Sequence, residues 1–191
     1  GLSGMHLDFE SLRPSFAADY AAFAMELRKL LDGRDLTVAA YPSVGMSVSR
    51  SGMYDLEALS KTDGVVMMCY DLHDRNSGRG PVTDLKWAEN CVIEALRKVP
   101  AEKLWLGVPL YGYMYGPDGE VSYVTMKKGE EYLQRAKARR LKGGVLHAWV
   151  RLGGRDYGMY LPDRRTIREL EKLSLRYHLA GVAYWRSGFE S

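Results

Sequence analysis

The sequence is poor in cysteine and has no long apolar run, and both absences exclude classes of protein. Its 2 cysteines in 191 residues are too few for a disulfide framework or a cysteine-based metal site. Cys69 falls in an apolar stretch and Cys91 in a helical one, so both are expected to be buried free thiols. No apolar run approaches the roughly 18 residues of a membrane span. No charged-then-apolar leader opens the chain, although a leader could lie upstream of its first residue.

Strong charge of one sign is also missing. The net charge of +3 argues against a dedicated nucleic-acid binder, which usually has a concentrated basic face. With 46% hydrophobic and 27% charged residues the chain is typical of a globular protein, and its length suits one domain. The densest basic stretch, 135–142, is expected to be the solvated flank of a helix; the alternative is affinity for an anionic polymer such as a cell wall.

An alternating stretch at residues 4–10 carries the most distinctive chemistry. Side chains in a strand repeat every two residues, so one face should present His6, Asp8 and Glu10. The other face should bury Met5, Leu7 and Phe9 in an apolar layer. Two carboxylates about 7 Å apart repel each other, which favours a retained proton on one of them near neutral pH, as an acid catalyst requires. The alternative is a solvated strand edge that leads into the next helix.

Apolar strands alternate with helices along most of the chain, which predicts a parallel α/β architecture. Strands are expected at 4–10, 36–41, 64–70, 104–111 and 180–185, and helices at 16–31, 54–60, 83–98 and 163–177. The alternation of strands and helices is interrupted between 112 and 160. An insertion is expected there, with a basic helix at 126–141 and short strands near 145–150 and 157–161. Polar and aromatic candidates follow the strand ends, where barrel enzymes place their active sites. No glycine-rich phosphate loop follows any of these strands.

Four motifs at these strand ends resemble those of glycoside hydrolase family 18, which includes chitinases and spore-cortex and cell-wall hydrolases. They are Ser3–Glu10 for D-G-x-D-x-D-x-E, Met68–Asp71 for M-x-Y-D, Gly107–Gly112 for G-x-P-x-Y-G and Gly181–Trp185 for G-V-x-x-W. The resemblance implies a (β/α)8 TIM barrel, here strands 4 to 8 with a small α+β insertion after strand 7. The partial barrel is expected at 1–111 and 161–191, and the insertion at 112–160.

The resemblance also implies roles for particular side chains. Glu10 would act as general acid and then as base, Asp8 would orient the 2-acetamido group of the substrate, and Tyr70 would donate a hydrogen bond to its carbonyl. Residues implied in substrate binding are Asp71, Tyr111, Trp185, Tyr41 and His6. No metal or organic cofactor is required by this chemistry.

Two departures from the family pattern stand out. Ser3 and His6 replace acids of the signature. A cationic His6 would lower the pKa of neighbouring carboxyl groups, whereas a neutral His6 would only fill a polar position in the barrel interior. A complete barrel of this type takes about 250 residues and eight strands. Five strands would leave unpaired sheet edges, so the chain is expected to be part of a longer protein or to be completed by another chain.

The leading hypothesis is a glycosidase that cleaves β-linked N-acetylglucosamine-containing polysaccharide, peptidoglycan or spore cortex before chitin, by a substrate-assisted retaining mechanism. Its partner would be the polysaccharide, with no nucleic acid or membrane span, and its location extracellular or at the cell envelope or spore. The alternatives are a non-catalytic sugar-binding protein, a hydrolase with a conventional pair of carboxylates, and an inactive truncated chain. Aromatic residues of the insertion could line a sugar groove or pack in a small core; they are Tyr113, Tyr115, Tyr123, Trp149 and Tyr157. Trp87 and Trp105 are expected in the core.

Overall fold

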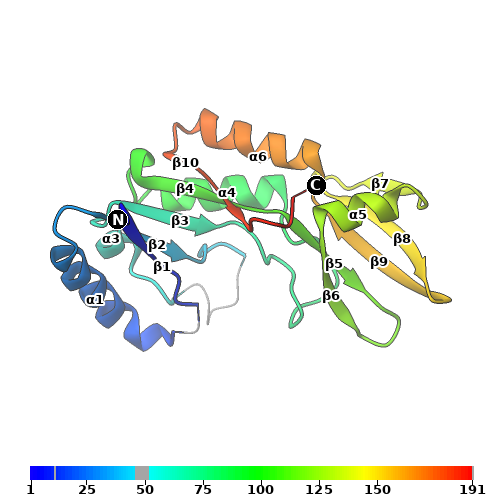
Figure 1. The fold of residues 1–191 in the computed structure, drawn as a ribbon, viewed down its shortest axis with the longest axis horizontal. Helices are drawn as coiled ribbons and strands as arrows, with labels where there is room; N and C mark the ends of the chain where they lie inside the picture. The colour runs from blue at the N-terminus through cyan, green and yellow to red at the C-terminus, as the bar shows by residue number, and fades with distance from the viewer. Residues whose placement is uncertain (11, 46–51, 191) are drawn as a thin grey trace. The chain divides into compact units, whose positions relative to one another are not determined.

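The structure is a computed structural model that describes residues 1–10, 12–45 and 52–190 (Figure 1). The chain divides into two compact units. The first unit comprises residues 1–69, 89–107 and 173–183, and the second comprises 70–88, 108–172 and the residues from 184 on. Among the described residues, no helix has both the length and the apolar character that crossing a bilayer would need.

The first unit is built on a sheet whose central strands, β2 (Asp35–Ala40) and β3 (Gly64–Met68), are mostly buried. Its other strands are β1 (Gly4–Leu7), β4 (Leu104–Pro109) and β10 (Gly181–Trp185), and the order is β1-β2-β3-β4-β10. The first four pair in parallel, and one row of the register runs Leu7, Val38, Val65, Leu104. Every residue of that row is buried, as expected for a parallel sheet that is covered on both faces.

Helices alternate with these strands. They are α1 (Ala17–Leu30), which follows the 3-10 turn η1 (Pro14–Phe16), α3 (Leu56–Leu59), α4 (Leu85–Ala95) and α6 (Arg164–Arg176), with the 3-10 turn η2 (Ala101–Lys103) before β4. Asp55 begins α3 by accepting a hydrogen bond from the amide of Ala58, at 3.0 Å. The prediction of a mixed α/β fold with a parallel sheet is confirmed, and it is consistent with part of a TIM-barrel-like fold.

The second unit contains an antiparallel sheet. Its strands are β5 (Tyr111–Tyr115), β6 (Val121–Thr125), β7 (Ala138–Arg140), β8 (Leu146–Leu152) and β9 (Arg155–Leu161), in the order β6-β5-β9-β8-β7, with helix α5 (Met126–Leu133) after β6. A small core lies on this sheet and is made of Met114, Val124, Ala148, Val150, Met159 and Leu161. The unit therefore has an apolar core of its own.

The basic segment was predicted wrongly as one long helix over 126–141. Helix α5 ends at Leu133, and residues 138–140 form β7, which pairs antiparallel with β8. Side chains of β7 are exposed at the edge of the sheet, where cationic residues discourage further strand pairing. The stretch predicted as one strand over 104–111 is also divided, since Leu110 separates β4 from β5 and donates its amide to the carbonyl of Trp185, at 2.7 Å.

We expect Gly112→Ala to destabilise the second unit. Gly112 lies on β5, and a Cβ atom there would overlap the carbonyl oxygen of Tyr160 on β9. The overlap involves backbone on both sides, so relief requires the two strands to separate, and the free energy of unfolding should fall by about 1–3 kcal/mol. Urea denaturation measures this. Gly78→Ala is the matched control, because a Cβ there meets nothing within 4 Å; equal stability of the two variants would contradict the close approach.

We expect an acid-dependent loss of stability at the start of α6. Burial raises the pKa of Asp163, but hydrogen bonds from Arg140 and Thr166 outweigh it and lower the pKa to about 2. Because the folded pKa lies below the ordinary value of 3.8, the stabilisation is present above about pH 4 and is lost as the pH falls towards 2. Asp163→Asn should therefore flatten the pH dependence of the unfolding free energy over that window. A slope unchanged in the variant would assign the acid sensitivity to other carboxyl groups.

Candidate functional site

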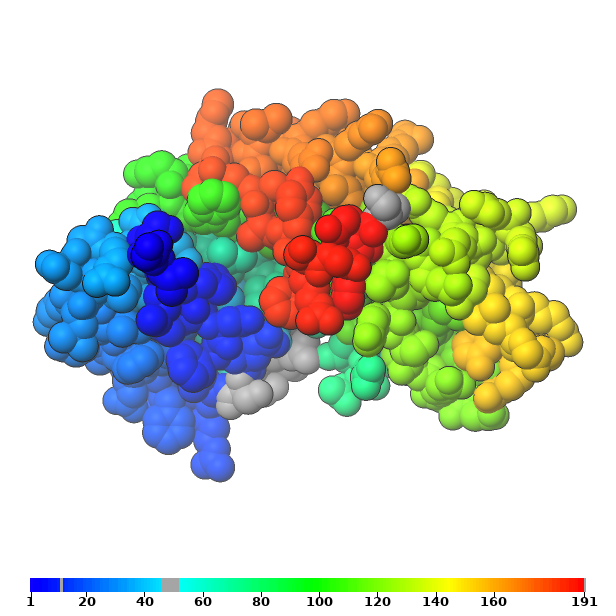
Figure 2. Space-filling model, in the orientation of Figure 1, coloured from blue at the N-terminus to red at the C-terminus, as the bar shows by residue number. Residues whose placement is uncertain are grey.

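The two acids of the N-terminal motif lie just beyond a strand and not within it. Strand β1 ends at Leu7, so Asp8 and Glu10 follow its carboxyl end, and the predicted strand over 4–10 is too long. The predicted apolar face is also only partly buried, since Leu7 is covered whereas Met5 and Phe9 are 45% and 46% exposed. Figure 2 shows this N-terminal segment, in dark blue, uncovered at the surface. The acids are thus placed where side chains can meet a ligand.

The parallel register of β1 and β2 brings a tyrosine to Glu10. Leu7 pairs with Val38, and three residues further along each strand stand Glu10 and Tyr41. The buried Tyr41 hydroxyl donates a hydrogen bond to Glu10 Oε2. The segment is further fixed by Tyr54, whose hydroxyl donates to the carbonyl of Phe9, at 2.7 Å. The hydrogen bond from Tyr41 therefore orients the side chain of Glu10 in the absence of substrate.

Asp8 lies in an environment that favours its protonated form. Burial is the main cause that raises the pKa of Asp8, the negative charge of Glu10 adds to it, and His6 opposes both. The repulsion between Asp8 and Glu10 expected from the sequence is thus present, but it raises the pKa of Asp8 less than burial does. The buried ring of Tyr20 is affected as well, since burial and the charge of Asp8 raise the pKa of Tyr20 to about 12. The Tyr20 hydroxyl has no hydrogen-bond partner among the residues that the structure describes.

His6 occupies the position at which the family signature has an acid. Its Nδ1 lies 2.8 Å from the hydroxyl oxygen of Thr37 on β2. Burial lowers the pKa of His6, against the opposing charge of Asp8, which favours the neutral imidazole near pH 7. Of the two states left open by the sequence, the neutral one is therefore favoured, and His6 shares a hydrogen bond with the neighbouring strand.

The second group of predicted residues belongs to the second unit and is centred on Asp71. Tyr70 and Asp71 follow the end of β3, and the backbone of Asp71 is left-handed, with a φ of 58°. Asp71 Oδ1 accepts hydrogen bonds from the hydroxyls of Tyr111, at 2.5 Å, and Tyr113, at 2.9 Å. Burial, followed by the charge of Asp71, raises the pKa of both tyrosines, so they stay protonated donors. The sequence did not predict Tyr113 as a partner of Asp71.

One hollow of about 270 Å³ within the second unit is lined by Asp71, the two tyrosines that donate to it and Trp185. Trp185 is 40% exposed, and Tyr123 is 52% exposed and stacks on Phe189 with ring centroids 5.5 Å apart. The complete lining is Asp71, Arg75, Tyr111, Tyr113, Tyr123, Trp185, Arg186 and Phe189. Exposed aromatic faces beside a carboxylate suit a sugar ring. Arg75, Arg186 and Phe189 were not predicted from the sequence, although Arg186 directly follows the last predicted strand.

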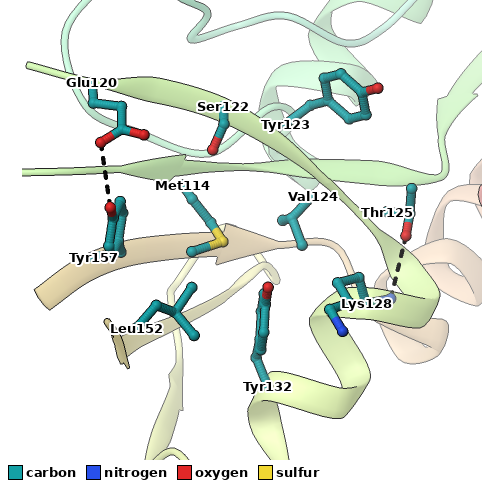
Figure 3. Close-up of a pocket in the computed structure, with 10 residues that line it drawn as sticks. All are labelled: Met114, Glu120, Ser122, Tyr123, Val124, Thr125, Lys128, Tyr132, Leu152 and Tyr157. Atoms are coloured by element: carbon teal, nitrogen blue, oxygen red, sulfur yellow. Dashed lines mark hydrogen bonds between the residues drawn. The ribbon is translucent and has the colours of Figure 1, made fainter. Parts of the chain in front are cut away.

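Aromatic residues of the insertion divide between core and surface. Tyr113 and Tyr115 are buried, whereas Tyr123 and Trp149 are exposed. Tyr157 lines a second hollow of about 440 Å³ with Met114 and Val124 at its floor and α5 at one side (Figure 3). Tyr113 and Tyr115 are thus packed in the interior, and a sugar groove lined by the exposed rings stays a prediction. Elsewhere, Trp87 is buried and Trp105 is half-buried, with a ring that contacts Gly64 and Gly181.

Within each unit, the structure brings several predicted residues together. His6, Asp8, Glu10 and Tyr41 stand at or beyond the ends of β1 and β2, and Asp71, Tyr111 and Trp185 line the hollow of the second unit. Tyr70 is buried, with its ring centroid 6.4 Å from that of Tyr111. Cys69 and Cys91 are buried free thiols, as predicted. No group of three or more His, Cys, Asp or Glu side chains able to hold a metal ion occurs in residues 1–10, 12–45 and 52–190.

Similarity to known proteins covers nearly the whole chain. The model of the glycosyl hydrolases family 18 matches residues 1–189. Over 201 residues the chain is 25% identical to the uncharacterized glycosylase YvbX of Bacillus subtilis (strain 168), covering 98% of this chain and 58% of YvbX. Over 208 residues it is 24% identical to the cortical fragment-lytic enzyme of the same organism, covering 98% of this chain and 47% of that enzyme. The chain spans about half the length of these curated relatives.

A solved structure extends this similarity to the fold. The crystal structure of a chitinase from Chromobacterium violaceum ATCC 12472 matches with a TM-score of 0.91 and 25% sequence identity. The match covers 100% of this chain and 63% of the chitinase.

We expect Glu10→Gln to lower the pKa of Asp8 without restoring its ordinary value. The charge of Glu10 is the second cause of the raised pKa, and burial, the larger cause, remains in the variant. A 13C NMR titration of the aspartate side-chain carboxyl groups measures the shift. Glu57→Gln removes a carboxylate from α3 and is the matched control, which should leave the Asp8 titration in place. An unaltered Asp8 titration in Glu10→Gln would show that the two carboxyl groups do not interact.

Proposed function

Because this chain belongs to glycosyl hydrolase family 18, we propose that it hydrolyses the β-linked bonds of a polysaccharide that contains N-acetylglucosamine. The observation that carries the proposal is the arrangement beyond β1, where Glu10 accepts a hydrogen bond from Tyr41 and Asp8 has a raised pKa. Glycoside hydrolysis uses two carboxyl groups with different roles, one that transfers the proton and one that stabilises the developing positive charge. Glu10 also stands at the last acid of the family signature.

We propose a substrate-assisted retaining mechanism. Glu10 donates its proton to the glycosidic oxygen while the carbonyl oxygen of the substrate's 2-acetamido group attacks the anomeric carbon, and the bond to the leaving sugar breaks. While Glu10 carries its proton, it no longer adds a negative charge that raises the pKa of Asp8. Asp8 in its carboxylate form then accepts a hydrogen bond from the acetamido N–H and stabilises the positive charge of the cyclic intermediate. Glu10, now a carboxylate, then takes a proton from the water that opens this intermediate. Tyr41 holds the Glu10 side chain through both proton transfers.

The residues of the second group are assigned to substrate binding. Tyr70 would donate a hydrogen bond to the acetamido carbonyl. Asp71, whose Oδ1 is held by two tyrosine hydroxyls, would accept hydrogen bonds from sugar hydroxyl groups. Trp185 offers an exposed ring for the C–H face of a pyranose. With His6 neutral, Asp8 and Glu10 are the two groups of the motif that exchange protons.

Cell-wall or spore-cortex peptidoglycan is the preferred substrate, before chitin. The name of one relative, a cortical fragment-lytic enzyme, supports this preference, whereas the structural match is a chitinase. A peptidoglycan substrate would place the protein at the cell envelope or spore.

We expect Glu10→Gln to lower the turnover of a fluorogenic N-acetylglucosamine oligomer by about 10²–10⁴-fold, because the amide cannot donate a proton to the glycosidic oxygen. The assay uses the full protein that carries this chain, with Glu57→Gln as the matched loss of a carboxylate outside the motif. Full turnover in Glu10→Gln would exclude the mechanism. Sugar binding without turnover in the unsubstituted protein would instead support a non-catalytic sugar-binding protein.

A second substrate separates substrate assistance from a conventional carboxylate nucleophile. An oligomer of glucose lacks the 2-acetamido group, so the substrate-assisted route should not cleave it, whereas a conventional pair should still do so. Glu10-dependent cleavage of this oligomer at a comparable rate would favour Asp8 or Asp71 as a covalent nucleophile.

A further inference from the structure

One strand of the antiparallel sheet extends past the end of its neighbour. β7 pairs only with residues 146–148 of β8, because its first residue, Ala138, lies opposite Ala148. β8 continues beyond this point and pairs with β9 as far as Leu152, which lies opposite Arg155. Among the residues that the structure describes, residues 150–152 of β8 thus have a neighbouring strand on one side only. Such an edge can accept a further strand through main-chain hydrogen bonds.

The alternation of backbone groups along β8 directs the amide and carbonyl of Arg151 to this edge. The amide of Leu141 donates to the carbonyl of Val145, at 2.8 Å, and hydrogen-bonded pairs of an antiparallel ladder recur every two residues. Arg139 and His147 therefore form such a pair, and the backbone groups of His147 point toward β7. Those of Arg151, four residues further along β8, point to the same side, where β7 has not yet begun.

A hollow of about 370 Å³ lies along this edge, within the second unit. Val150 and Leu152 of β8 line it, together with Tyr132 of α5 and Ala136 of the turn after α5. Tyr132 and Leu152 also line the neighbouring hollow, where their side chains are drawn in Figure 3. The space between the strand edge and the helix end is therefore open to a ligand and has an apolar wall.

The two faces of β8 differ at this edge. Val150 belongs to the small core of the sheet, and Leu152 packs against that core. Trp149 and Arg151 are exposed on the opposite face. Because side chains alternate along a strand, a strand added here needs apolar residues on one face and polar residues on the other.

Positive charge surrounds the hollow. Residues 132–155 contain seven Arg or Lys residues and no Asp or Glu. Lys137, directly before β7, is exposed and forms no ion pair within the part of the chain that the structure describes. Since like charges repel, pairing with a second copy of this cationic edge is disfavoured, whereas an acidic strand is attracted.

Carboxylates neutralise only part of the charge in the lining. Glu131 pairs with Lys128, at 2.6 Å, and Asp156 pairs with Arg151, at 3.2 Å. Arg135 is the remaining cation of the lining, and it forms no ion pair or side-chain hydrogen bond with any described residue. The hydrogen bond to Glu131 raises the pKa of Lys128, and the charge of Arg135 opposes this effect. The guanidinium of Arg135 thus remains available to an acidic group of a ligand.

We propose that this edge of β8 is a docking site for an extended acidic peptide of a partner protein, in which apolar and acidic residues alternate. The peptide backbone pairs with the amide and carbonyl of Arg151. Its apolar side chains pack on Ala136 and Leu152, and its acidic side chains meet Arg135 and Lys137. A peptide is the favoured partner because its N–H and C=O groups recur at the spacing of a strand edge, unlike the charged groups of a polyphosphate or an acidic polysaccharide.

Two capped octapeptides test the proposal with the full protein that carries this chain. One alternates valine and glutamate, and the other has lysine in place of each glutamate. In NMR titrations at low salt the glutamate peptide should bind at least about tenfold more tightly, and this preference should fall with added salt. The amide of Arg151 should become protected from hydrogen exchange in the complex, because it joins a strand pair.

Methylated peptides separate strand pairing from simple attraction between charges. Two derivatives of the glutamate peptide carry N-methyl groups on either the valine or the glutamate amides. Amides of one kind face β8 in an added strand, so one derivative should lose binding and the other should retain more of it. Equally tight binding of both derivatives and of the parent peptide would identify a general surface for polyanions and overturn the proposal.

A pair of double variants tests the cations. Arg135→Gln with Lys137→Gln should weaken binding of the glutamate peptide roughly fivefold or more. Arg165→Gln with Arg168→Gln removes the same charge from exposed positions of α6 and is the matched control. Equal binding of the glutamate and lysine peptides, an unprotected Arg151 amide in the complex, or equal losses in the two double variants would each overturn the proposal. Turnover of an N-acetylglucosamine oligomer should be the same in both double variants, so failure of this proposal leaves the proposed hydrolysis untouched.

Discussion

Parallel hydrogen bonding between β1 and β2 is the constraint on which the N-terminal motif depends. The pairing of Leu7 with Val38 fixes which residues emerge together at the carboxyl ends of the two strands, and three residues later these are Glu10 and Tyr41. A slip of one residue would turn the buried row to the opposite face and separate the acid from its hydroxyl donor. The row is held because Val38, Val65 and Leu104 are fully buried in the same sheet.

In both units, a carboxylate accepts hydrogen bonds from tyrosine hydroxyls. Glu10 accepts from the hydroxyl of Tyr41, and Asp71 accepts from those of Tyr111 and Tyr113. A tyrosine hydroxyl is neutral, so it orients a carboxylate without cancelling the charge that a substrate must meet. An arginine in the same place would pair with the acid, as Arg140 pairs with Asp163 at the start of α6. Tyrosine partners therefore distinguish Glu10 and Asp71 from the structural Asp163.

Apolar runs made much of the fold predictable from sequence. Strand β3 is a continuous apolar segment and β2 has a mostly apolar one, and the two pair in parallel, as predicted. The error over 126–141 arose because charge and helix propensity do not reveal strand pairing, and β7 is fixed by its antiparallel contact with β8. The partnership of Asp71 with Tyr113 was not predictable for a similar reason, since it joins residues 42 positions apart. Burial is the largest cause of the lowered pKa of His6, and a local sequence pattern contains no measure of burial.

The tyrosines around Asp71 have a consequence for the thermodynamics of binding. Tyr111 packs edge-on against both Tyr70 and Tyr113, and its hydroxyl is already hydrogen-bonded. Its side chain therefore loses rotational freedom when the chain folds and has little left to lose when a ligand enters. The exposed ring of Tyr123 is stacked on Phe189 and is restricted in a similar way. The conformational entropy of these tyrosine side chains should accordingly contribute little to differences in affinity between sugars at this hollow.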